Sequence, residues 1–243
     1  MGEYFREPGN RIQAGFALHA GRLLAQYCSL TATLRSQEKY DATLAVCVLQ
    51  SLLTSCTELL SAMRASQKPF FSEVITDVPH RWGLTRSFIT QDTFPTDVTL
   101  ERVLEHMRNA LSHPTSSEST QHVSTGFTTS NDASGLVSAF RFTDSPWISR
   151  GDIYWGASSK KQEKVQKTIQ DFERRYNLNG FLALRREPDG TFGVEHNGTT
   201  FLPVFVIQLP LPALIDLAKC LANYLAQPTN EQWDGQSIHQ LVA

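Results

Sequence analysis

The chain has 243 residues, of which 41% are hydrophobic and 19% are charged, an ordinary composition for a globular protein with a sizeable core. The formal charge of −2 gives no overall basic field, so any contact with nucleic acid needs a local basic patch. The first residues carry acids and a proline where a signal peptide has an apolar run, and no stretch approaches the roughly 18 apolar residues of a membrane span. We therefore expect a cytoplasmic protein without a membrane partner.

Two long amphipathic helices are expected at the start of the chain. In the first, at about 11–35, apolar side chains recur at steps of three and four, at Ile12, Phe16, Leu23, Tyr27, Leu30 and Leu34. In the second, at about 41–65, Asp41 is a candidate cap and the apolar stripe consists of Leu44, Val48, Leu52, Cys56, Leu59 and Met63. The next segment, 67–96, has three prolines and no sustained period, which predicts an ordered connection with room for one short helix.

A third helix is expected at about 98–113. Its apolar stripe consists of Leu100, Val103, Leu104, Met107 and Leu111. After Pro114 the composition changes to Ser, Thr, Asn and Gly, which predicts a mobile loop at about 115–135.

The second half of the chain has a different pattern. A strand at 136–142 and a helix at 160–176 are followed by strand-like runs at 181–184, 191–195 and 200–208, which Asp-Gly and Asn-Gly pairs separate. A fourth bundle helix, at about 211–226, has an apolar face of Leu214, Leu217, Ala218, Leu221 and Leu225. The predicted fold is mainly α, a single domain over 1–243. It is a four-helix bundle with an α+β insertion, a small β-meander plus one helix, at about 115–208 between the third and fourth helices.

The third helix ends in the sequence RNALSH at 108–113. Each residue of a helix turns the side chain by about 100°, so Asn109 and His113 lie about 180° and 220° from Leu100 and point away from the bundle core, while Arg108 flanks the core at about 80°. Arginine offers a permanently charged fork that matches phosphate oxygens, and histidine acts as a general acid or base. Metal-free cleavage of an RNA phosphodiester needs both groups. Because one copy supplies a single histidine, two facing copies would make a more complete catalyst.

With the helix that carries it, this sequence resembles the R-x(4-6)-H signature of the HEPN superfamily, whose arginine, polar residue and histidine correspond to Arg108, Asn109 and His113. The resemblance implies a helical bundle that dimerises along the motif helix and forms a composite, metal-independent ribonuclease cleft, leaving a 2′,3′-cyclic phosphate. It also implies a toxin or abortive-infection effector that acts on RNA without a cofactor. A possible antitoxin partner would come from a neighbouring gene. The alternative is a non-catalytic dimeric module that binds a protein or nucleic acid through the same face.

Two further residues of this helix are candidates for substrate contact. His106 could line the cleft or lie in solvent, and Glu105 could orient Arg108 from one turn back, although a solvent-facing glutamate is commoner. The histidine pair His106 and His113 also suggests a metal site. Without a third clear ligand this interpretation is disfavoured, so we expect no metal.

Other candidates lie away from this helix. Arg81 and Trp82 combine charge with a stacking surface that suits single-stranded RNA, but an aromatic residue packed into the loop's own small core is equally plausible. The helix at 160–176 carries a basic face that could follow an RNA backbone, although a solvated face is the default; its members are Lys160, Lys161, Lys164, Lys167, Arg174 and Arg175.

Overall fold

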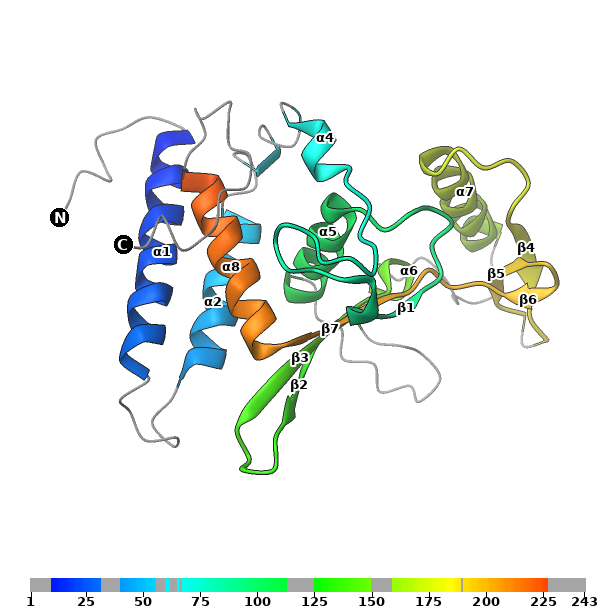
Figure 1. Ribbon diagram of the computed structural model, residues 1–243. Helices are drawn as coiled ribbons and strands as arrows, with labels where there is room; N and C mark the ends of the chain where they lie inside the picture. Colours follow the sequence, from blue (N-terminus) through cyan, green and yellow to red (C-terminus); the bar gives the residue numbers. More distant parts are fainter. Residues whose placement is uncertain are drawn as a thin grey trace.

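The computed structural model describes residues 10–31, 40–55, 60–61, 65, 67–112, 125–149, 159–188 and 190–226, whose arrangement Figure 1 shows. The elements in chain order are α1 (Asn10–Thr31), α2 (Asp41–Ser55), α4 (Lys68–Phe71), η3 (Arg86–Phe88), β1 (Ile89–Asp92), α5 (Leu100–Ser112), β2 (Gly126–Asn131), β3 (Val137–Asp144), α6 (Pro146–Ser149), α7 (Ser159–Arg175), β4 (Ala183–Arg186), β5 (Phe192–His196), β6 (Thr199–Thr200), β7 (Phe205–Pro210) and α8 (Leu211–Ala226). None of these helices is both long enough and apolar enough to cross a membrane.

The main body of the molecule combines helices with a sheet. α1, α2 and α8 pack against one another, and α5 packs on α2 (Figure 1). A four-stranded antiparallel sheet, in the order β1-β7-β3-β2, contacts α5 through β3 and β2. One apolar core runs through both layers and includes Leu49 of α2, Met107 of α5, Phe142 of β3 and Leu217 of α8, all at most 1% exposed. α5 therefore lies between α2 on one side and the four-stranded sheet on the other.

The expectation of a mainly α fold is wrong, because the described residues include seven strands in two antiparallel sheets. The four-stranded sheet takes β1 from the segment before α5, β2 and β3 from the segment after it, and β7 from the residues just before α8. Its strand pairs join distant parts of the chain, as where Phe142 lies opposite Ile207. The periodicity of a single strand does not show which distant strand pairs with it. This sheet belongs to the main core and is not part of a separate insertion.

Three segments differ from their predicted structure for related reasons. The expected loop at 115–135 contains β2, whose residues are almost all exposed and so lack the apolar alternation of a half-buried strand. The expected strand at 200–208 is split, because β6 pairs with β5 whereas β7 pairs with β1 and β3. The expected connection at 67–96 contains α4, η3 and β1.

α7 and the three-stranded sheet β4-β5-β6 form a smaller unit beside the main body (Figure 1). They share a second apolar cluster that includes Trp147, Val165, Phe172 and Val194. Phe94, which precedes α5, packs against both this cluster and the main core. We call α7 with β4, β5 and β6 the α7 unit.

α1 packs through small side chains and leaves larger ones outside. Its buried face includes Ala14, Ala17, Gly21 and Leu24, whereas Phe16, Leu23 and Leu30 are 38%, 54% and 62% exposed. A Cβ atom added at Gly21 would lie 2.8 Å from the Cβ of Ala222 on α8. The absence of a side chain at this glycine thus sets how closely the two helices approach.

Candidate functional site

α5 carries most of the candidate residues. It begins after Thr99, whose hydroxyl accepts a hydrogen bond of 3.3 Å from the backbone N–H of Arg102 and so caps the first turn. It ends at Ser112, two residues before Pro114, and a proline disfavours the helical conformation of the residue that precedes it. His113, the expected catalytic histidine, lies outside the described residues.

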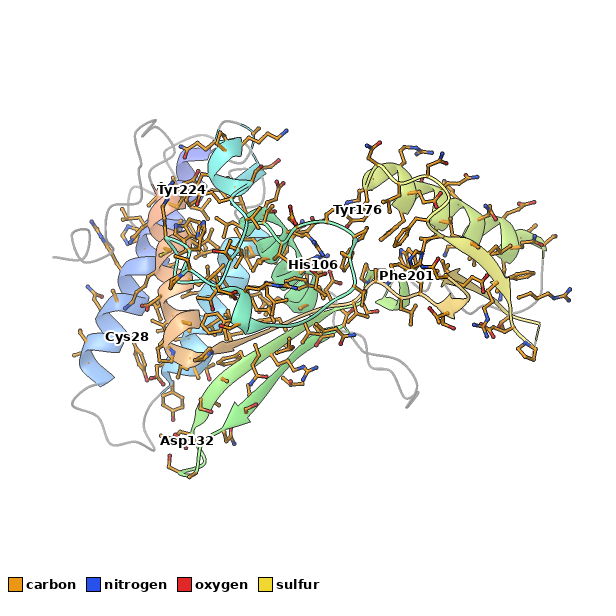
Figure 2. The ribbon with its side chains drawn as sticks, turned by 45° about the vertical axis from the view of Figure 1, so that its right-hand side comes forward. Cys28, His106, Asp132, Tyr176, Phe201 and Tyr224 are labelled. Carbon is orange, nitrogen blue, oxygen red and sulfur yellow. The ribbon has the colours of Figure 1, made fainter. Side chains whose placement is uncertain are left out.

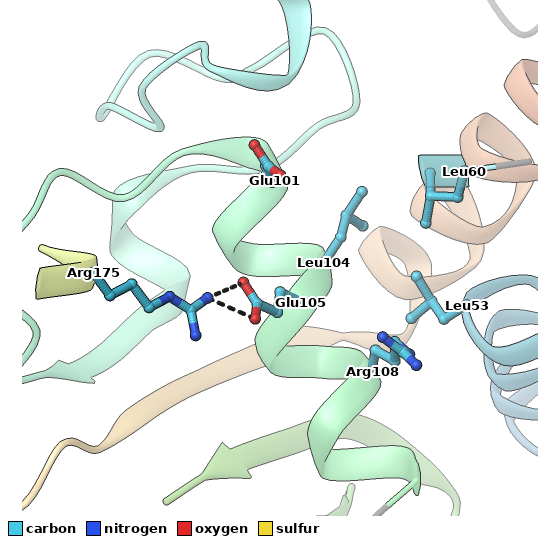
Figure 3. Close-up of a pocket in the computed structure, with 7 residues that line it drawn as sticks. All are labelled: Leu53, Leu60, Glu101, Leu104, Glu105, Arg108 and Arg175. Carbon is cyan, nitrogen blue, oxygen red and sulfur yellow. Dashed lines mark hydrogen bonds and ion pairs between the residues drawn. The ribbon is translucent and has the colours of Figure 1, made fainter. Parts of the chain in front are cut away.

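One side of α5 stays open and lines a pocket of about 260 Å³ (Figure 3). Its apolar wall is formed by Leu53 of α2, Leu60 and Leu104. Its charged lining is formed by Glu101, Glu105 and Arg108 of α5 and by Arg175 of α7. The charges of the two glutamates and the two arginines cancel, so the lining has no formal net charge. The motif arginine therefore lies in a pocket that pairs an apolar wall with two guanidinium groups.

An ion pair joins the two helices across this pocket. Nη2 of Arg175 donates to both carboxylate oxygens of Glu105, at 2.8 and 2.9 Å. Burial lowers the pKa of Arg175, but the hydrogen bonds and the negative charge of Glu105 outweigh that effect and raise it above its ordinary value. Glu105 lies between the two guanidinium groups, with Arg175 reaching it from one side and Arg108 pointing toward Leu53 on the other (Figure 3). Glu105 thus binds Arg175, a partner that neither alternative for this residue, orienting Arg108 or facing solvent, had named.

The opposite side of α5 packs against β3 through a buried carboxylate. Oδ2 of Asp144 accepts a hydrogen bond from Nδ2 of Asn109 at 2.8 Å and lies 2.8 Å from Nδ1 of His106. Asp144 is 1% exposed and His106 is 5% exposed. Asn109 points away from the apolar stripe of α5, as its angle on the helix predicts, but it is half-buried and its amide bonds to Asp144 of the sheet, so it does not face freely outward as expected.

His106 belongs to α5 and lies near the middle of the molecule (Figure 2). Its ring stacks on Phe205 with centroids 4.4 Å apart and packs against Phe94 at 4.7 Å. Its Nε2 atom is buried and has no hydrogen-bond partner among the described residues. Neither expected environment, a cleft lining or a solvated surface, is found. In this arrangement the imidazole helps to hold α5 to the sheet and does not face a substrate.

Sequence reasoning missed Asp144, although a signal for it was present. Phe140, Phe142 and Asp144 alternate along β3 and are all buried on one side of the strand. A carboxylate that continues an apolar alternation lies on the buried face and needs a polar partner there. The polar partners, His106 and Asn109, come from the side of α5 that points away from its apolar stripe.

A second buried ion pair lies one turn earlier on α5 and was also missed. Nη2 of Arg102 donates to Oδ1 of Asp92 at 2.6 Å, and both side chains are less than one tenth exposed. The guanidinium lies over the rings of Phe94, at 4.8 Å, and Phe205, at 5.8 Å. It fastens the start of α5 to the end of β1.

Trp82 and Arg81 lie elsewhere and do not line the pocket. Trp82 is 2% exposed and packs against the rings of Phe70 and Tyr224, with centroids 5.3 and 5.5 Å away. Of the two alternatives for Trp82, the structure therefore shows the packed aromatic residue and not a stacking surface for RNA. Arg81 is exposed and pairs with Glu73 at 2.6 Å.

His80, next to this cluster, is held in one protonation state by its contacts. Its Nδ1 accepts a hydrogen bond of 3.1 Å from the backbone N–H of Trp82, and its Nε2 lies 2.9 Å from a carboxylate oxygen of Glu73. Burial lowers the pKa of His80, and the nearby carboxylate counteracts that effect only in part. Protonating Nδ1 would break the bond to Trp82.

The described residues around the open side of α5 bring two guanidinium groups and two carboxylates together in one pocket. Across the described parts of the chain, no three histidine, cysteine or carboxylate side chains gather closely enough to hold a metal ion. The basic face of α7 is largely exposed; Lys160, Lys161, Lys167, Arg174 and Arg175 are exposed and Lys164 is half-buried. Comparisons with protein-family models, with curated proteins and with solved structures give no match for this chain.

Proposed function

We propose that the protein is an endoribonuclease that needs no metal ion and that uses Arg108, at the open side of α5, together with His113. The observation that carries the proposal is the position of Arg108, which lines the same pocket as a second guanidinium group, that of Arg175. His113, the motif histidine, follows the last residue of α5 directly in the sequence. Arginine forks match phosphate oxygens in geometry and charge.

In the proposed reaction the ribose 2′-oxygen attacks phosphorus, and the bond from phosphorus to the 5′-oxygen breaks. A general base removes the proton of the 2′-hydroxyl, and a general acid protonates the departing 5′-oxygen, so that a 2′,3′-cyclic phosphate and a 5′-hydroxyl remain. His113 fills one of these two roles, and Arg108 neutralises the charge that develops on the phosphate oxygens. A second copy of the chain would supply the other histidine. Asn109, bound to Asp144, positions the helix and does not touch the phosphate.

Such an enzyme would act in the cytoplasm, as a toxin or as an effector of abortive infection. Uncontrolled cleavage of cellular RNA arrests growth, so a cognate antitoxin from a neighbouring gene is the expected partner. These parts of the proposal rest on the resemblance of residues 108–113 to the HEPN motif.

The test is cleavage of total RNA by the purified protein and by single variants. We expect His113→Ala to lower the rate by about 10²- to 10⁴-fold. We expect Arg108→Ala to lower it by about 10²- to 10³-fold. Arg22→Ala, which removes an exposed helical arginine far from α5, is the matched control and should cleave like the wild type. A chelator should leave the rate unchanged, and full activity of the His113 variant would overturn the proposal.

Binding of RNA without cleavage is the second candidate. It is favoured by the engagement of Asn109 with Asp144, which occupies the amide of the motif's polar residue and leaves it no part in catalysis. In that case the wild type would cut no RNA, while RNA binding would require Arg108 and would survive His113→Ala.

A further inference from the structure

We propose that Arg175 is a second phosphate-binding residue for the RNA substrate, so that the α7 unit contributes directly to the site on α5. The inference rests on the proposed function. It adds that Arg108 and Arg175 bind two different phosphates of the same RNA strand. Arg175 lies 70 positions after Glu105 in the sequence, yet both line one pocket. The α7 unit thereby gains a role in substrate binding.

The free donors of Arg175 support this role. A guanidinium has five N–H groups. Both bonds to Glu105 use Nη2, so the N–H groups of Nη1 and Nε make no hydrogen bond with the residues that the structure describes. The Arg175 side chain is 55% exposed, and its guanidinium lies over the ring of Tyr176 at 5.7 Å. The group is thus charged, oriented and still able to donate to an anion.

Glu105 has two opposite effects on an anion at this pocket. Its bonds hold the guanidinium of Arg175 in one orientation. Its negative charge, however, repels a phosphate that approaches Arg108 or Arg175. A glutamine at position 105 keeps a carbonyl acceptor for Arg175 and removes the repulsion. The proposal therefore predicts that loss of the positive charge weakens RNA binding and that loss of the negative charge strengthens it.

A purely structural role predicts a different result. If the ion pair only fastens the α7 unit to α5, then Arg175→Ala and Glu105→Gln both weaken the same contact. Both changes would then alter stability and RNA binding in the same direction. Opposite effects of Arg175→Ala and Glu105→Gln on RNA binding therefore indicate a phosphate-binding arginine, and effects in the same direction indicate an ion pair that only joins α5 and α7.

The experiment measures binding of a short uridine-rich RNA, labelled with fluorescein, by fluorescence anisotropy. All proteins carry His113→Ala, so that no RNA is consumed. We expect Arg175→Ala to weaken binding about 5- to 20-fold. The slope of log K against log salt concentration should fall by about 0.7, the value for one phosphate contact on a single strand. Glu105→Gln should tighten binding by about 2- to 5-fold.

Two matched controls lie on the α7 unit. Arg186→Ala removes an exposed arginine of β4, and Glu163→Gln removes an exposed glutamate of α7. Both should leave the affinity and the salt slope unchanged. If Arg175→Ala does not melt cooperatively, Arg175→Lys keeps the charge without the fork and should weaken binding by an intermediate amount.

Three results would overturn the inference: an unchanged affinity and slope in Arg175→Ala, equal weakening by Arg175→Ala and Glu105→Gln, or no RNA binding by the folded His113→Ala protein. Failure of the proposed function has a separate signature. If the wild type cleaves RNA and Arg175→Ala leaves KM unchanged, the inference fails and the ribonuclease stands. If the wild type cleaves nothing but binding depends on Arg175, the ribonuclease fails and the phosphate contact stands.

Discussion

Replacing Asp144 by alanine should destabilise the protein more than any surface change, because this carboxylate serves two donors on α5. The variant leaves Nδ1 of His106 buried without an acceptor, which costs about 1–3 kcal/mol. Asn109 is half-buried and can reach water, so its lost hydrogen bond costs about 0.5–1.5 kcal/mol. Together these losses lower the free energy of unfolding by about 2–4 kcal/mol. A chain of this size then melts about 6–12 °C lower for a loss near 3 kcal/mol.

Urea denaturation followed by circular dichroism measures the loss directly. Asp144→Asn keeps the shape and one carbonyl acceptor, so it should lose about half as much as Asp144→Ala. Asp216→Ala, an exposed aspartate of α8, is the matched control and should change stability by less than about 0.5 kcal/mol. If Asp144→Ala is as stable as this control, the carboxylate does not hold α5 to the sheet and the reasoning is refuted.

Three further changes test other parts of the structure. Gly21→Ala should lower the free energy of unfolding by about 1 kcal/mol in urea titrations, because the clash with Ala222 outweighs the better helix propensity; Ala222→Gly should relieve it, and a stabilised Gly21→Ala would contradict the close approach. Arg102→Ala should cost about 3 kcal/mol in thermal melts, because the buried Asp92 then keeps only the more distant Arg86, at 3.9 Å, as a charged partner, and a loss under about 1 kcal/mol would argue against the pair. The pKa of His80 is lowered below its ordinary value of 6.5, so near pH 6.5 the unfolded chain binds more protons than the folded protein does. The free energy of unfolding that this histidine contributes is therefore fully present above pH 6.5 and decreases as the pH falls below it. His80→Asn keeps an acceptor for the backbone N–H that Nδ1 now binds and should flatten this dependence in urea titrations from about pH 5 to 8; an unchanged slope would assign it to another group.

α5, α7 and α8 could be predicted closely because each carries its own apolar period. The last helix was expected at 211–226 and forms at Leu211–Ala226, and the helix expected at 160–176 forms at Ser159–Arg175. The exposed apolar stripe of α1 shows the limit of this reasoning. A period identifies a helix, but the face that packs depends on the neighbours, and Gly21 with its alanines allows a closer approach than leucines would.

The sheet and the site depend on contacts between distant segments, so less of them could be predicted. β2 consists largely of exposed polar residues and is a strand only because β3 pairs with it. The same limit applies to Arg175, since nothing near it in the sequence indicates that Glu105 will bind it. Asp144 is a different case: its place in the alternation of β3 was readable, but its partners on α5 were not.

The junction between β7 and α8 has a mechanical consequence. β7 ends at Pro210 and α8 begins at Leu211, so no flexible residue separates the sheet from the helical layer. Pro210 lies opposite Ala139 of β3, which fixes the corner from the strand side, and Leu214 is buried on the helix side. This direct junction restricts how far the sheet and the helical layer, which pack on either side of α5, can move apart. A force that pulls the sheet away must bend this corner before it frees the motif helix.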